Sequence, residues 1–216
     1  MIEVREYTDP AGRSPFEKWF IGLDARAAAK VTVALARIEQ GNRSNVKGVG
    51  GGVSELRIDY GPGYRIYFGK DGERLVILLG GGTKKRQGAD IEAARRLWQE
   101  YKARKNVERL NVALTRDFKE TIKARSATDA AFRSALLTEA LECFLSGDAQ
   151  TGKAVLRDYI NATIGFEALG KETGRPPKSL MRMLGPRGNP QARNLFDVIA
   201  YLQKREGVHV EVHLAR

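Results

Sequence analysis

The sequence has very few of the residues that most often carry nucleophilic catalysis and metal binding. It contains one cysteine, Cys143, and two histidines, His209 and His213, and all three lie in its second half. The first 105 residues therefore exclude a histidine-pair ribonuclease, a cysteine nucleophile and a histidine-based metal site within that part of the chain. We expect no metal and no cofactor. Because one cysteine cannot form an internal disulfide, the expected location is the reducing cytoplasm.

Long apolar runs and an excess of acidic charge are also missing. No apolar run approaches the roughly 20 residues of a membrane-spanning helix, so we expect no membrane association. The glycine-rich run at 80–82 lacks the GxxxxGK[ST] spacing of a phosphate-binding loop, which argues against nucleotide hydrolysis. Lysine and arginine outnumber aspartate and glutamate by 37 to 26, a net charge of +11. This excess favours polyanionic partners, with nucleic acids first.

The first part of the chain has the pattern of an α+β domain. Ser14, Pro15 and Glu17 form a helix start with a capping box, and runs of β-branched and aromatic residues separated by glycine-containing turns predict hairpins. The expected elements are a strand at 2–7, helices at 15–22 and 24–41, strands at 53–59, 64–69 and 75–79, and a helix capped by Asp90 that reaches 101. The later strands should form an antiparallel sheet that the first strand joins.

From about residue 112 onward the chain is expected to be all-α. Helices should begin near 118 and cover 129–145 and 151–164. At 166–184 the spacing predicts a helix-turn-helix. Leu169 and Gly170 stand where a second helix would cross closely, and Gly174 allows the turn a positive φ.

The second helix of this motif carries the candidate DNA-binding residues. Leu180 and Met183 should turn inward. The side chains expected to meet DNA are Arg175, Lys178, Ser179 and Arg182. The prolines at 176–177 fit a first helical turn sterically, but they reduce the number of base-reading side chains. The alternative is a helical hairpin with a basic outer face.

These segments resemble two known families. The region 165–189 resembles the HigA-type antitoxins, relatives of the Cro/C1 repressors, and this likeness extends over nearly all of 112–216. Segments 55–58, 61–68 and 78–87 are similar to HigB-type toxins of the RelE/ParE superfamily. The resemblance implies a RelE-like toxin domain at 1–105, a linker at 106–111 and a HigA-like antitoxin at 112–216. The join is a departure, since the family normally makes two chains.

The resemblance also implies a chemistry for the first domain. RelE-like toxins are metal-independent endonucleases that cleave mRNA on the ribosome, by attack of a ribose 2′-hydroxyl on the adjacent phosphate. Such a reaction needs cations, a proton acceptor and surfaces that hold bases. The candidate catalytic residues are Arg65, Arg57, Lys84, Lys85 and Tyr64, and the candidate RNA-binding residues are Arg86 and Tyr60.

Each of these candidates has a structural alternative. Arg65 could form an ion pair with Asp59 or Glu55, Tyr64 could pack in the core, and residues 84–86 could be a solvated loop.

The sequence therefore predicts a toxin–antitoxin fusion in which an mRNA endonuclease acting at the ribosome is neutralised by intramolecular contact with its antitoxin. The antitoxin part would bind operator DNA, as a homodimer, and repress its own operon. Two alternatives stay open: a ParE-like toxin that poisons DNA gyrase, and a DNA-binding regulator without enzymatic activity.

Overall fold

The computed structural model describes residues 2–107 and 114–212 and divides the chain into two compact units, Met1–Thr121 and Ile122–Arg216. This division falls later than the expected start of the antitoxin at 112. Of the expected linker, 106 and 107 continue a helix, and 108–111 lie outside the described residues. The assignment of the two parts to toxin and antitoxin stays a prediction.

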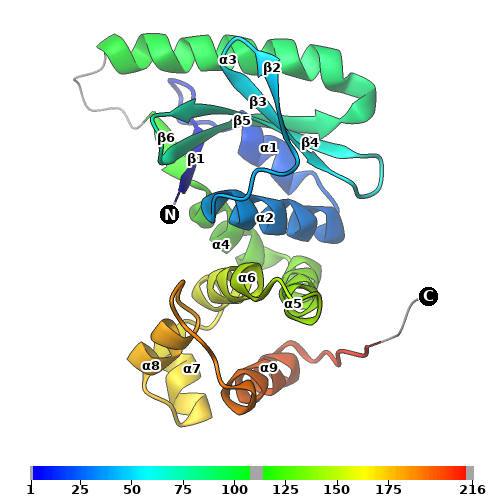
Figure 1. The fold of residues 1–216 in the computed structure, drawn as a ribbon, viewed down its shortest axis with the longest axis vertical. Helices are drawn as coiled ribbons and strands as arrows, with labels where there is room; N and C mark the ends of the chain where they lie inside the picture. Colours follow the sequence, from blue (N-terminus) through cyan, green and yellow to red (C-terminus); the bar gives the residue numbers. More distant parts are fainter. Residues whose placement is uncertain (1, 108–113, 213–216) are drawn as a thin grey trace. The chain divides into compact units, whose positions relative to one another are not determined.

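The first unit is built on one six-stranded sheet (Figure 1). Its elements are β1 (Glu3–Tyr7), α1 (Pro15–Ile21), α2 (Ala25–Glu39), β2 (Val46–Gly50), β3 (Val53–Ile58), β4 (Tyr64–Asp71), β5 (Leu75–Thr83), a 3₁₀ turn η1 (Lys84–Arg86), α3 (Gln87–Val107), β6 (Thr115–Asp117) and the start of α4 (Phe118–Thr128). The strand order is β2-β3-β4-β5-β1-β6. This arrangement is α+β, as the sequence predicts.

The expected antiparallel sheet is wrong in one respect: the sheet is mixed. β1 pairs in parallel with β5, whereas the other neighbouring strands pair antiparallel. Parallel neighbours need a long crossover, and the chain between β1 and the β3–β5 meander supplies one through α1 and α2. Two strands were not expected, β2 and β6, because neither shows the apolar alternation of a half-buried strand.

Local capping explains the starts of α1 and α2. Ser14 accepts a hydrogen bond from the Glu17 amide at 3.0 Å, so the predicted cap at Ser14 is confirmed. Asp24 caps α2 in the same way, because it accepts a hydrogen bond from the Ala27 amide at 2.9 Å. The prediction that Asp90 caps the next helix is wrong. α3 follows directly from η1, and Asp90 lies in its first turn.

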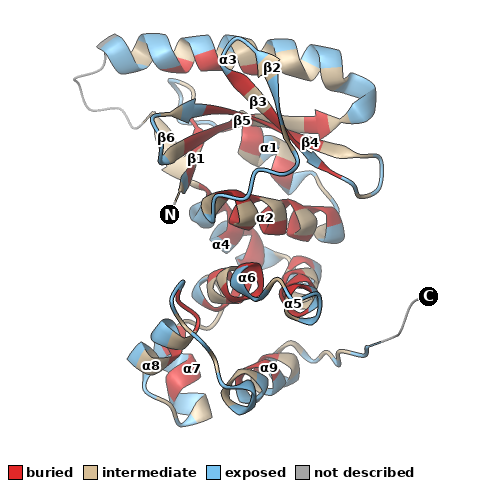
Figure 2. Cartoon of the chain, viewed as in Figure 1, coloured by how far each residue is buried: buried red, intermediate tan, exposed pale blue. Residues whose placement is uncertain are grey.

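Glycines allow helices to lie close against both faces of the sheet. A Cβ at Gly69 would lie 2.4 Å from the Trp98 ring of α3, and one at Gly81 would lie 2.3 Å from the Trp19 ring of α1. α3 therefore covers one face, and α1 covers the other together with α2 (Figure 1). The strands between them are largely buried, while the outer side of α3 is exposed (Figure 2). Within the run at 80–82, Gly81 thus has a packing role.

The second unit is helical throughout its described residues. It holds the rest of α4, α5 (Ala130–Leu145), α6 (Ala149–Ala162), α7 (Phe166–Thr173), α8 (Pro177–Met183) and α9 (Ala192–Glu206). A partly buried polar cluster joins three of these helices. Tyr159 of α6 donates to Glu206 of α9 at 2.8 Å, and Arg133 of α5 pairs with the same carboxylate at 2.9 Å.

α7 and α8 are joined by the glycine turn that the spacing predicts. Gly174 ends α7 with φ +64°, and a Cβ at Gly170 would lie 2.7 Å from the Arg175 carbonyl oxygen, so glycine permits the close crossing. Leu169 and Leu180 are buried. Met183 is only partly buried, and Leu184 is the buried residue at the end of α8.

Gly80 and Gly81, neighbours in β5, give a matched test of this packing. Gly81→Ala should destabilise the first unit by about 1–3 kcal/mol, because the added methyl group overlaps the Trp19 ring. Gly80→Ala should not, because a Cβ there has no neighbour within 4 Å. Both tryptophans of the chain, Trp19 and Trp98, lie in this unit, so urea unfolding followed by tryptophan fluorescence isolates it. Equal losses for the two variants would contradict the packing argument.

Candidate functional sites

Arg57 and Arg65 lie side by side on neighbouring strands. Arg57 of β3 is the register partner of Arg65 of β4, and such partners point to the same face of a sheet. This is the face that α3 covers, since it also carries Tyr67, which packs with Trp98 in one core cluster. Arg57 is exposed, whereas Arg65 is only 9% exposed. The two arginines therefore lie together but in different environments.

The guanidinium of Arg65 is held by a buried carboxylate. Its Nε lies 3.3 Å from Oε2 of Glu55, which is 1% exposed, and its Nη1 donates to the Gly63 carbonyl oxygen at 3.2 Å. Gln87 donates to the same Glu55 oxygen at 2.7 Å. Burial and the Glu55 charge raise the pKa of the nearby Tyr67 hydroxyl. Of the two ion pairs considered for Arg65, the one with Glu55 is present.

Exposed cations gather around the turn that joins β3 and β4. Lys84, Lys85 and Arg86 are exposed on η1, and the Lys84 amide donates to the Gly63 carbonyl oxygen at 3.0 Å. A Cβ at Gly63 would lie 3.7 Å from Arg65 Nη1 and 3.9 Å from the Lys84 Cβ. Tyr60 is partly exposed in this turn. We define Arg57, Tyr60, Lys84, Lys85 and Arg86 as the basic rim.

A carboxyl group lies beside this rim. A Cβ at Gly82 would overlap the Asp90 carboxyl group, so glycine makes room for it. Burial raises the pKa of Asp90, and the charge of Arg86 opposes that shift. The sequence predicts Asp90 only as a helix cap. It contains no signal that the Asp90 carboxyl group would lie beside Gly82 and the basic rim.

Tyr64 lies on the other face of the sheet. Adjacent residues of a strand alternate in direction, so Tyr64 and Arg65 point to opposite sides. The Tyr64 ring meets Trp19 of α1 edge-on at 6.3 Å, and burial and the neighbouring Asp24 raise the pKa of its hydroxyl. The structure therefore does not bring Tyr64 together with the arginines.

A short segment, Leu114–Thr121, completes the other edge of the sheet; we call it the docking segment. Its strand β6 pairs with β1, with Glu6 opposite Arg116, and the Thr8 amide donates to the Leu114 carbonyl oxygen at 3.0 Å. Phe118 packs edge-on against the Phe16 and Phe20 rings at 5.6 and 5.4 Å. The segment is thus built into the first unit.

Arg116 connects the docking segment to two carboxylates. One of its nitrogens lies 2.8 Å from both Glu6 and Glu17. Glu6 is fully buried, and desolvation raises its pKa against the opposing effect of hydrogen bonds from Thr121, Arg116 and Ser14. Sequence reasoning missed this role of Glu17, which it considered only as part of a capping box.

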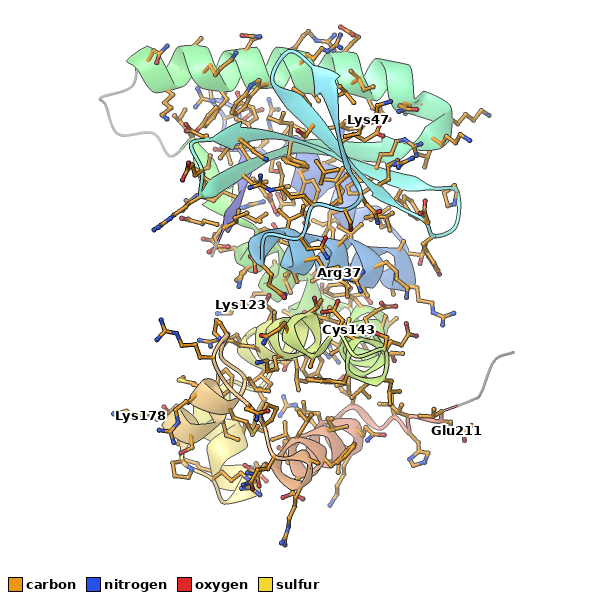
Figure 3. All side chains as sticks on the ribbon, viewed as in Figure 1. Arg37, Lys47, Lys123, Cys143, Lys178 and Glu211 are labelled. Carbon is orange, nitrogen blue, oxygen red and sulfur yellow. The ribbon has the colours of Figure 1, made fainter. Side chains whose placement is uncertain are left out.

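In the second unit the four predicted DNA-binding residues lie on or next to α8. Lys178 and Arg182 are exposed, Ser179 is partly exposed, and Lys178 points away from the helices (Figure 3). Arg175 is paired with Asp197 of α9 at 2.7 Å. Three of the four, Arg175, Ser179 and Arg182, line a groove of about 500 Å³.

Comparison with known proteins assigns the first unit. Residues 18–102 match the family described as phage derived protein Gp49-like (DUF891). An uncharacterized protein of Haemophilus influenzae is 44% identical over 86 residues, which cover 39% of this chain and 87% of that protein. The chain belongs to the Gp49-like family. No solved structure matches the chain.

The Gp49-like family is associated with toxin–antitoxin modules. The family match includes the basic rim and the Arg65–Glu55 pair, but it ends before the docking segment and the second unit. The finer HigB and HigA identities go beyond this family assignment. No helix in the described part of the chain is long and apolar enough to cross a membrane.

Substitutions at the two neighbouring arginines should have different effects on the stability of the first unit. Arg65→Ala should destabilise the first unit by about 3–5 kcal/mol, because it leaves the Glu55 carboxylate buried without a cation. Arg57→Ala should change stability by less than about 0.5 kcal/mol, because its side chain is exposed. Urea unfolding of both variants checks this. The double variant Arg65→Met, Glu55→Leu should recover most of the loss, and failure to recover would contradict the ion-pair argument.

The docking segment should respond to pH through Glu6. Arg116→Met removes the cation beside this buried carboxyl group, so the folded-state pKa of Glu6 should rise further. A raised folded-state pKa means that stability falls as pH rises through that pKa. The variant should therefore lose about 1–3 kcal/mol near pH 7 and less near pH 4.5. Urea unfolding at both pH values tests this, and adding Glu6→Gln should remove the extra pH dependence. Equal losses at both pH values would contradict it.

Proposed function

We propose that the chain is a toxin–antitoxin module in one polypeptide, with a ribosome-dependent mRNA endonuclease in its first unit. The observation that carries this proposal is the basic rim, an exposed set of four cations and a tyrosine beside the Arg65–Glu55 pair. The family's association with toxin–antitoxin modules supports it. The first 105 residues contain no histidine or cysteine, so the chemistry must rely on lysine, arginine, tyrosine and carboxylate groups.

The rim fits the needs of 2′-hydroxyl attack on a phosphate. Arg57 and Arg86 would bind the scissile phosphate and stabilise the charge that develops on its oxygens. The attack forms a bond from the 2′-oxygen to phosphorus and breaks the bond from phosphorus to the 5′-oxygen of the next nucleotide. Lys84 or Lys85 would pass the 2′-hydroxyl proton to that leaving oxygen, and the Tyr60 ring would stack on a base. Arg65 would act from beneath the surface: its bond to the Gly63 carbonyl oxygen fixes the turn around which the rim gathers.

Neutralisation would come from the docking segment. Adding a strand to an exposed sheet edge is a recurring mode of peptide recognition, and β6 does this along β1. In a HigB–HigA arrangement, this segment would be the antitoxin's contact with the toxin. The second unit would bind operator DNA through α7 and α8 as a helix-turn-helix, with Arg175, Lys178, Ser179 and Arg182 facing the duplex.

Growth of cells that express the full chain tests the proposal. Arg116→Glu places a third carboxylate beside Glu6 and Glu17, so it should displace the docking segment without cutting into the aromatic core. Inducing this variant should arrest growth and cleave ribosome-bound mRNA, whereas the wild-type chain should do neither. Adding Arg57→Ala with Lys84→Ala should abolish the arrest. Adding Arg74→Ala, an exposed arginine at the far end of the β4–β5 hairpin, should not.

Other outcomes favour the alternatives. Arrest with intact mRNA and blocked DNA replication would favour a ParE-like gyrase poison. No arrest by a folded Arg116→Glu variant, as judged by its tryptophan fluorescence, would overturn the toxin proposal and favour a DNA-binding regulator.

A further inference from the structure

The groove beside α8 contains residues that the helix-turn-helix pattern does not include. The polar lining residues include Arg175, Ser179, Arg182, Arg187, Asn189 and Asn194. Arg187 and Asn189 come from the loop between α8 and α9, which we call the 185–191 loop. The groove's lining has no acidic residue. Arg182 and Arg187 are exposed, and neither forms an ion pair within the described parts of the chain. Such a lining suits phosphate groups.

The 185–191 loop lies tightly against the end of α8. A Cβ at Gly188 would lie 2.2 Å from the Met183 carbonyl oxygen and 2.4 Å from that of Arg182. Only glycine fits this approach without a shift of the backbone. The position of Arg187 in the groove therefore depends on how the backbone at Gly188 is held.

A buried lysine holds that backbone. Lys153 of α6 is 3% exposed, and its Nζ donates to the Gly188 carbonyl oxygen at 2.6 Å. One turn later, Arg157 donates to the Met181 carbonyl oxygen at 3.5 Å. The carbonyl end of a helix attracts cations, so both side chains are favourably placed beside the end of α8.

The environment of Lys153 is costly for a cation. Burial lowers its pKa, and no carboxylate pairs with it among the described residues. A methionine would fill similar space without the desolvation penalty. Keeping a lysine here is explained if the Gly188 carbonyl must be held in one place.

We propose that the groove is a phosphate-binding site for the backbone of duplex DNA, with Arg187 as a phosphate contact and Lys153 as the residue that positions it. The proposal rests on the DNA binding proposed for the second unit and extends it to residues outside α7 and α8. Lys153 does not touch the DNA. It acts through the Gly188 carbonyl oxygen. Holding this oxygen in place fixes the position of the 185–191 loop relative to Arg182.

The test is a double-mutant cycle on the full chain. The probe is a labelled duplex with the DNA upstream of this chain's own coding sequence, titrated at several salt concentrations. Lys153→Met and Arg187→Ala should each weaken binding about tenfold, and together still about tenfold rather than a hundredfold, because both remove the same contact. Each should reduce the magnitude of the salt slope by about 0.9, the value for one phosphate contact. A merely structural loss would leave this slope unchanged.

Matched variants complete the design. Lys204→Met, at an exposed lysine in the last turn of α9, should leave affinity and slope unchanged. Gly188→Ala, which displaces the loop and keeps Lys153, should reproduce the Lys153→Met result, and it replaces that variant if the latter does not fold.

Each contrary result has a distinct meaning. No duplex binding by the wild-type chain would overturn the DNA-binding part of the proposed function. An unchanged slope in Arg187→Ala would overturn the groove site. Additive losses in the cycle would overturn the role of Lys153. Equally tight binding to an RNA duplex of the same sequence would overturn the assignment to DNA.

Discussion

The first unit depends on β1 having a partner strand on both edges. β5 pairs with one edge and β6 with the other, so the backbone groups of this strand are satisfied and Glu6 is enclosed. The family match ends at 102, so the strand that closes this edge comes from sequence beyond the family domain. Arg116 and Phe118 anchor that strand through charge and aromatic packing respectively. The part of the chain that matches the family would therefore lack this strand pairing if it were separated from the residues that follow it.

The sequence predicted the elements that are set by residues close to one another in the chain. The cap at Ser14, the helix that starts at Asp24, the β3–β5 meander and the Gly170–Gly174 turn follow from local patterns, and each is present. The strands β2 and β6 could not be predicted in this way. β6 holds three polar residues, and its pairing is set by Glu6, which is more than a hundred positions away in the chain. Long-range partners leave no periodic signal.

The candidate site was predictable to a similar extent. The cations at 57 and 84–86 are predicted because they are basic, with Arg57 one strand over from Arg65 and residues 84–86 after the last strand, and they do gather around the β3–β4 turn. Adjacent residues of a strand point to opposite faces of a sheet, so Tyr64 and Arg65 cannot share one site on it. The prediction placed them in one site on the basis of residue type alone. The Arg65–Glu55 pair depended on strand register, so the sequence offered Asp59 and Glu55 equally. The positions of Lys153 and Gly188 depend on tertiary packing and gave no signal in the sequence.

Each candidate nucleic-acid surface contains one arginine paired with a carboxylate, and burial distinguishes the two pairs. The Arg65 and Glu55 side chains are 10% and 1% exposed, whereas those of Arg175 and Asp197 are 29% and 49% exposed. A surface pair contributes at most about 1 kcal/mol, so an incoming phosphate can displace Asp197 and take its place on Arg175. Removing Arg65 from Glu55 would leave a buried charge, which is far more costly. Arg175 is therefore available to bind a polyanion directly, whereas Arg65 contributes chiefly by fixing the turn beneath the exposed cations. In the proposed function, the exposed arginines and lysines around each pair would supply the charge that attracts the nucleic acid.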